Sequence, residues 1–144
     1  EQLDAISFFP FGEGETMPFV KWALRTGQSF ISPVNFLVHV DLGLFVSFRG
    51  ALGFYQKLHI TGLTKGYPCE ECARTCVVAC PAEAISSNSY VDSKCIEYLK
   101  RQADKLCDVG CLVRRSCPVG KDKRSHEQSK FHMRAFRSSK MGQF

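Results

Sequence analysis

All eight cysteines of this 144-residue chain lie in one stretch, and that stretch limits what the chain can fold into more than any other feature does. They are Cys69, Cys72, Cys76, Cys80, Cys95, Cys107, Cys111 and Cys117. A proline follows the fourth and the eighth, so the stretch divides into two halves that end alike. Each half holds four thiols, the number that a closed metal site takes from a protein.

Three chemistries compete for these thiols. Disulfides suit small secreted proteins without a core, but this chain is 44% hydrophobic with twelve phenylalanines, and its cysteines are too closely spaced for four bridges. Zinc favours Cys-x-x-Cys pairs, and only Cys69 and Cys72 form one. Short spacings closed by Cys-Pro are typical of [4Fe–4S] sites. We therefore expect two [4Fe–4S] clusters bound by all eight cysteines, in a reducing compartment such as the bacterial cytoplasm or the mitochondrial matrix, with zinc as the alternative.

The first part of the chain, residues 1–66, predicts a small helix followed by a β-hairpin. Thr16 is the expected N-cap and Gly27 the C′ residue of the helix, with an apolar side made of Phe19, Val20, Ala23 and Leu24 and with Trp22 as a core anchor. Residues 36–40 and 44–48 alternate with period two around a turn at 41–43, which predicts two paired strands. A linker at 56–68 then leads to Cys69.

The rest of the chain predicts a cluster-binding domain at residues 67–120 and a basic helix or tail at 121–144. Asp92 should begin a helix that runs to about Lys105, and Ser125 with Gln128 resembles a capping box. The last helix should bury Phe131, Ala135 and Phe136 and leave His126 and His132 exposed. The expected fold class is α+β: a ferredoxin-like domain of short helices and wrapped loops behind the helix and hairpin.

Charge and hydropathy indicate which kinds of partner the chain should bind. The net charge of +5 is concentrated after residue 120, and such a tail is more often a solvated or partner-docking segment than a nucleic-acid-binding one. No apolar run approaches the ~20 residues that a membrane-spanning helix needs, although a peripheral position on a membrane complex is open. Arg114 and Arg115 either offset cluster charge or are solvated.

The cysteine pattern resembles the bis-[4Fe–4S] ferredoxin domain of epoxyqueuosine reductases and reductive dehalogenases. The resemblance rests on Cys-x2-Cys-x3-Cys-x3-Cys-Pro, on the segment 95–99 (Cys-Ile-Glu-Tyr-Leu), and on the final Arg-Arg-x-Cys-Pro-Val-Gly. In two-cluster ferredoxins the Cys-Pro residue binds the other cluster. The resemblance therefore implies one ligand set of Cys69, Cys72, Cys76 and Cys117, and a second set of Cys80, Cys95, Cys107 and Cys111.

Two departures from that family shape the expected function. The third cysteine is one residue late, and only 68 residues precede Cys69, which leaves no room for the cobalamin-binding domain. We therefore expect an electron-transfer protein without a catalytic site of its own, working with protein redox partners in a larger assembly. The alternatives are an accessory subunit of a respiratory or other redox complex whose clusters are structural, and a zinc-stapled interaction module.

Overall fold

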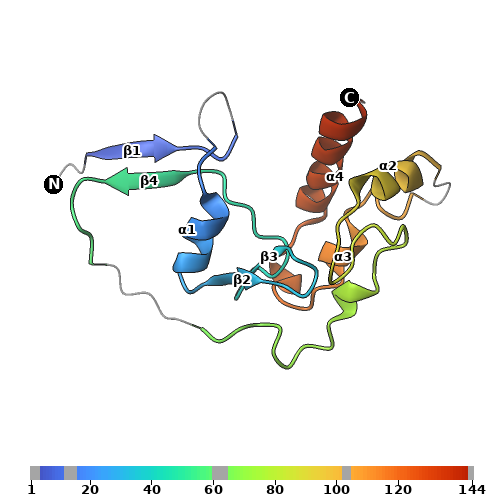
Figure 1. Cartoon of the computed structure of the whole chain (residues 1–144), viewed down its shortest axis with the longest axis horizontal. Coiled ribbons are helices and arrows are strands. Elements are labelled where there is room, and N and C mark those ends of the chain that lie inside the picture. Colours follow the sequence, from blue (N-terminus) through green and yellow to red (C-terminus); the bar gives the residue numbers. More distant parts are fainter. Residues whose placement is uncertain (1–3, 12–15, 60–64, 102–104, 143–144) are drawn as a thin grey trace.

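A computed structural model describes residues 4–11, 16–59, 65–101 and 105–142, and it shows short helices combined with two small antiparallel sheets (Figure 1). The elements are β1 (Ala5–Phe8), α1 (Phe19–Arg25), β2 (Ser29–Ile31), β3 (Leu37–His39), β4 (Ala51–Phe54), η1 (Thr75–Val77), α2 (Asp92–Arg101), α3 (Leu112–Arg115), η2 (Lys121–Lys123) and α4 (His126–Met141). The mixture confirms the α+β class. The β1–β4 pair and α1 lie at one end of the molecule, and α2, α3 and α4 lie at the other.

Helix α1 is attached to the first sheet by aromatic contacts. β1 and β4 pair antiparallel, with Ala5 opposite Phe54 and Phe8 opposite Ala51. The ring of Trp22 meets that of Phe8 edge-on at 5.7 Å between centroids. Trp22 thus anchors the helix, as predicted.

The ends of α1 agree only in part with the sequence prediction. Pro18 is the N-cap instead of Thr16, because its carbonyl accepts the first helical hydrogen bond from Trp22. Gly27 follows the C-cap with φ of +68°, which confirms it as the C′ residue. Val20 and Leu24 are exposed, contrary to expectation, and Ala23 is the buried residue of this seven-residue helix.

The predicted hairpin forms with a different partner strand. β3 pairs with β2, so that Leu37 lies opposite Ile31 and His39 opposite Ser29. The intervening turn is closed by hydrogen bonds between Ser32 and Phe36. Residues 44–48 are not a strand, which corrects the expected pairing of 36–40 with 44–48.

The turn at residues 41–43 is present, and it explains why the chain leaves the sheet. His39 and Gly43 exchange two backbone hydrogen bonds of 3.0 and 2.9 Å. Leu44 then enters the core at 1% exposure, and its carbonyl accepts a hydrogen bond from the Arg114 guanidinium. That carbonyl is therefore not available to a strand ladder.

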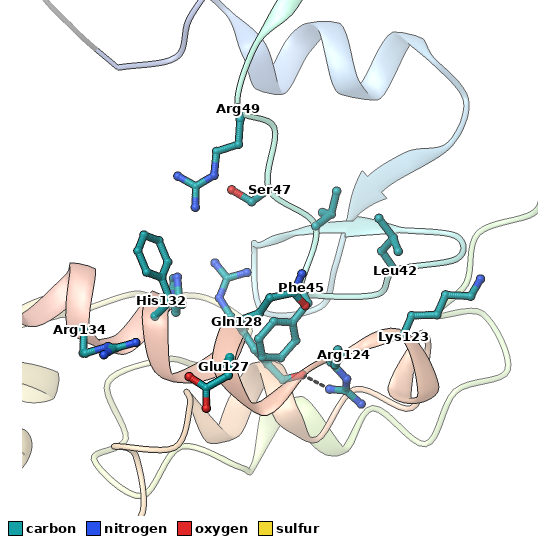
Figure 2. Close-up of a pocket in the computed structure, with 14 residues that line it drawn as sticks. Leu42, Phe45, Ser47, Arg49, Lys123, Arg124, Glu127, Gln128, His132 and Arg134 are labelled. Carbon is teal, nitrogen blue, oxygen red and sulfur yellow. Dashed lines mark hydrogen bonds between the residues drawn. The ribbon is translucent and has the colours of Figure 1, made fainter.

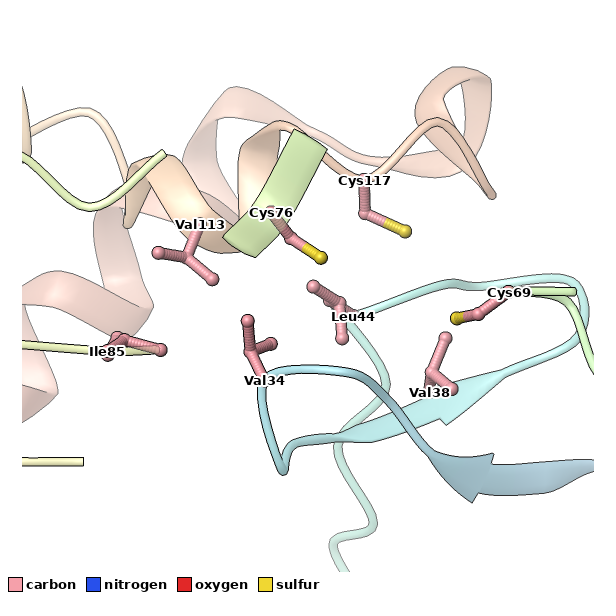
Figure 3. Packing of buried hydrophobic residues seen from close by; sticks show 8 residues of the cluster. All are labelled: Val34, Val38, Leu44, Cys69, Cys76, Ile85, Val113 and Cys117. Carbon is pink, nitrogen blue, oxygen red and sulfur yellow. The ribbon is translucent and has the colours of Figure 1, made fainter. Parts of the chain in front are cut away.

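The main core contains cysteines among its aliphatic residues (Figure 3). Its buried members are Val34, Val38, Leu44, Cys69, Cys76, Ile85, Val113 and Cys117. A second, smaller cluster joins Leu99 of α2, Cys107 and Met133 of α4. Both cores thus include thiols, so the folding of this region and the state of its cysteines are linked.

Helix α4 is held by its own domain. The predicted capping box is confirmed: the Gln128 amide donates to the Ser125 hydroxyl at 3.0 Å, and the Ser125 amide donates to the Gln128 side chain. Arg137 pairs with Asp108, and Lys140 pairs with Asp92 at 3.2 Å. The order of this basic segment therefore does not require a partner.

The buried side of α4 differs from the prediction in several residues. Met133 and Ser129 are buried, whereas Phe131 and Ala135 are exposed. His132, expected to be exposed, is half-buried. Among the described residues, no helix combines the length and the hydropathy needed to cross a membrane.

Candidate metal centre

The fold sorts the eight cysteines into two sets of four, each lining its own cavity. The first set lines a cavity of about 10 Å³ and consists of Cys69, Cys72, Cys76 and Cys117. The second set lines a cavity of about 150 Å³ and consists of Cys80, Cys95, Cys107 and Cys111. This grouping is the one that the ferredoxin resemblance implies. All eight are free thiols, and none is joined in a disulfide.

The first set brings together residues from both halves of the cysteine stretch. Cys76 lies on η1 and Cys117 follows α3, and these two elements pack against each other. The Thr75 hydroxyl donates to the Ser116 carbonyl at 2.8 Å and ties the two segments together. Figure 3 shows the sulfurs of Cys69, Cys76 and Cys117 directed toward the space beside Leu44.

The turn around Gly43 forms a wall of the first set. Gly43 has φ of +60°, and a Cβ built there would lie 2.9 Å from the Cys117 sulfur and 2.3 Å from the Val119 carbonyl oxygen. Only a glycine therefore lets the chain pass this close to the thiol. The close approach encloses Cys117, which is 7% exposed.

Backbone amides point at two of the sulfurs. The Arg74 amide donates to the Cys72 sulfur at 3.4 Å, and the Ala84 amide donates to the Cys80 sulfur at 3.3 Å. Arg74 and Glu83, which adjoin these contacts, both have positive φ, 52° and 48°. A loop curled in this way presents N–H groups to sulfur, as a site for an anionic thiolate cluster requires.

The second set is enclosed by α2, α3 and α4. Cys95 lies on α2, Cys111 is the N-cap of α3, and Cys107 packs with Met133 of α4. Tyr90, Tyr98, Met133 and Phe136 also line the cavity. These walls are mostly apolar, and they leave Cys107 buried and the other three thiols partly buried.

The pKa values of several thiols show that ionising each set is unfavourable when no cation is bound. Burial raises the pKa of Cys95 to about 11, and the other three thiols of its set add to the shift. Burial likewise raises the pKa of Cys76, again with the other three thiols of its own set contributing. The pKa values of Cys69 and Cys111 are also raised, mainly by burial. Four neighbouring thiols repel one another once ionised, and a bound metal cation reverses that penalty.

The donor set fits an iron–sulfur cluster better in one cavity than in the other. Cysteine thiolates in fours are the ligands of a [4Fe–4S] cluster, and the 150 Å³ cavity has room for several atoms. At about 10 Å³, the first cavity holds the thiols but would have to widen. In the described ranges, no three His, Cys, Asp or Glu side chains converge tightly enough to hold a metal ion. A four-iron core is wider than one ion, so its four thiols stand further apart than the ligands of a single ion. Four thiols around a shared cavity are therefore the arrangement to look for.

Arg114 and His132 form a wall of the second cavity. Offsetting cluster charge was one of the two expectations for Arg114, whereas His132 was expected to be exposed. The guanidinium of Arg114 lies 4.8 Å from the centroid of the Phe36 ring. Burial lowers the pKa of His132 to about 4, and Arg114 and Arg49 contribute to the shift. The Arg-Arg pair of the sequence pointed to Arg114, whereas no local signal distinguished His132.

Comparison with known protein families, curated proteins and solved structures finds no match to this chain. The resemblance to the ferredoxin domain of epoxyqueuosine reductases therefore stays a prediction from the cysteine pattern. The assignment of the site depends on its own geometry and chemistry.

Proposed function

We propose that this protein is an iron–sulfur electron carrier of the ferredoxin type, with two [4Fe–4S] clusters. The observation that carries the proposal is the sorting of eight thiols into two sets of four, each around one cavity. Thiols brought together by burial alone would not need to divide equally, nor to follow the crossover pattern of two-cluster ferredoxins.

The residues of the chain would hold, shield and tune the clusters. A [4Fe–4S] cluster takes up and releases one electron, at a potential set by its hydrogen bonds and its solvent exposure. Here the Arg74 and Ala84 amides would donate to ligand sulfurs, and the Arg114 cation would oppose the negative charge of the second set. Tyr90 and Phe136 would limit the solvent exposure of that set, because both line its cavity.

The proposed setting follows from the same chemistry. Free thiols and iron–sulfur clusters require a reducing compartment, which we place in a bacterial cytoplasm or on the matrix side of a mitochondrion. The carrier would exchange electrons with protein partners, within or next to a larger redox assembly. No enzymatic turnover of its own is proposed.

A second candidate function is a structural subunit of a redox complex, and the composition of the core favours it. Cys69, Cys76 and Cys117 are three of the eight buried residues of the main core. Metal bound there would contribute directly to the free energy of folding. In this case the clusters, or zinc ions, would hold the fold together without changing oxidation state.

The test is anaerobic purification, followed by a visible spectrum and by iron and zinc assays on the same sample. The carrier predicts about eight irons per chain and a broad band near ~400 nm that bleaches on reduction and returns on reoxidation. Iron that cannot be reduced without unfolding the protein would favour the structural subunit. A colourless protein containing zinc would eliminate electron transfer.

A further inference from the structure

A basic groove (Figure 2) shares Arg114 and His132 with the lining of the second thiol cavity. Its volume is about 650 Å³, and its walls come from residues 42–49 on one side and from η2 and α4 on the other. Figure 2 shows Arg49 extending from the loop, Lys123 on η2, and His132 and Arg134 on α4. Small-molecule sites are usually concave and have volumes of about 300–1,000 Å³.

The groove carries a large excess of positive charge. Its cationic side chains are Arg49, Arg114, Lys123, Arg124 and Arg134, and its carboxylate is Glu127. Glu127 pairs with Lys130 at 3.4 Å. In the described part of the chain, no carboxylate lies within ion-pair distance of the five groove cations. Lys123 helps to lower the pKa of the Asp41 carboxyl, so its charge is partly offset, and the groove keeps an excess of cations over carboxylates.

Two of these cations are built into the fold. Arg124 donates to the carbonyls of Arg114, Arg115 and Cys117 at 2.8–3.1 Å and stacks 5.3 Å from the centroid of the Phe45 ring. Arg114 donates to the Leu44 carbonyl. Their positions are thus set in advance, which lowers the entropy lost when an anion binds.

The other cations are available to a ligand. Arg49 lies 5.9 Å from the centroid of the Phe131 ring, and that exposed ring forms part of the wall. Lys123 and Arg134 make no side-chain hydrogen bond or ion pair with a described residue. Guanidinium groups match the oxygens of a phosphate, and aromatic walls match a flat ring.

The groove adjoins the thiols of the second set. Arg114 and His132 line both the groove and the second cavity. The depressed pKa of His132 agrees with this position, because the imidazole is half-buried and the charges of Arg114 and Arg49 act on it. A ligand in the groove would therefore lie one layer of side chains away from these thiols.

We propose that the groove is a binding site for a phosphate-bearing organic ligand of nucleotide size. Lys123 and Arg134 lie at opposite ends of the groove (Figure 2), so the ligand's phosphate would contact one of these two cations, and its ring would lie against Phe45 or Phe131 between them. The binding itself does not depend on the proposed clusters. If they are present, the ligand would be placed to exchange electrons with the second one, a consequence that rests on the proposed function.

Isothermal titration calorimetry on the full chain can test the proposal with two matched pairs of probes. Flavin mononucleotide is compared with riboflavin, and ADP with adenosine, in about 50 mM salt to limit screening. At least one phosphorylated probe should bind, and about tenfold or more tighter than its dephosphorylated counterpart. The double variant Lys123→Gln/Arg134→Gln should weaken that binding by about tenfold or more.

A control variant removes the same charge elsewhere. Lys21→Gln/Arg25→Gln lies on the exposed side of α1, outside the groove, and should leave binding unchanged. Circular dichroism on each sample shows whether the variant is folded, and its iron content shows whether it keeps the clusters. A loss of binding with both unchanged is then due to the groove itself. The proposal is overturned if neither phosphorylated probe binds, if the members of each pair bind equally, or if the two double variants behave alike. Binding of heparin without either nucleotide would also overturn it and would indicate a polyanionic partner.

Discussion

Replacing Gly43 with alanine should destabilise the protein through one specific contact. The backbone at Gly43 has φ of +60°, which costs a residue with a Cβ about 1 kcal/mol. The new Cβ would also lie 2.3 Å from the Val119 carbonyl oxygen and 2.9 Å from the Cys117 sulfur. Such crowding adds about 1–3 kcal/mol, because a backbone carbonyl cannot rotate away as a side chain can. The expected total is about 2–4 kcal/mol.

Gly142→Ala is the matched control for this prediction. Gly142 has nearly the same φ, +63°, but no heavy atom of the other described residues lies within 4 Å of the position that an added Cβ would take. It should therefore lose only the backbone contribution, about 1 kcal/mol. Anaerobic urea unfolding followed by circular dichroism measures both free energies. Equal losses, within about 0.5 kcal/mol, would refute the reasoning that the turn is packed against Cys117.

Three further predictions follow from the same structure. Cys95→Ser should lower the iron content by about half, measured per chain after anaerobic purification, and an unchanged content would contradict its place in a four-thiol set. Arg124→Ala removes hydrogen bonds to three carbonyls and should cost about 2–4 kcal/mol in urea unfolding, whereas Lys121→Ala should stay within about 0.5 kcal/mol. His132 has a folded pKa of about 4, below its unfolded value. The unfolded chain therefore binds more protons between about pH 6.5 and 4, and stability should decrease as the pH is lowered through that range; His132→Gln should reduce the slope.

The parts of the structure that the sequence predicted well are governed by local patterns. The capping box at Ser125 needs only a serine and a glutamine three residues apart. The C′ glycine at Gly27 follows from a left-handed backbone that few other residues adopt. The grouping of the cysteines was implied by the ferredoxin resemblance and not by a local pattern, because the first set joins Cys69 to Cys117.

The parts that the sequence did not predict depend on contacts between distant residues. The period-two pattern at 44–48 suggested a strand, but the Leu44 carbonyl is taken by Arg114, seventy positions further on. The groove likewise joins Arg49 to Arg134, and no short window of sequence contains both. The helical pattern placed His132 on the exposed side of α4. Its partial burial depends on the loop opposite, which that pattern does not reveal.

The division of the cysteines between the two cavities has a consequence for the order in which the chain assembles. The second set is complete within residues 80–111, whereas the first set begins at Cys69 and is completed only by Cys117. The segment between Cys76 and Cys117 therefore contains the whole second set. As the chain leaves the ribosome, the inner set of thiols can gather first, and the outer set closes around it last. A chain that stops just before Cys117 would keep four inner thiols and only three outer ones, so the outer set can be completed only after that residue has been made.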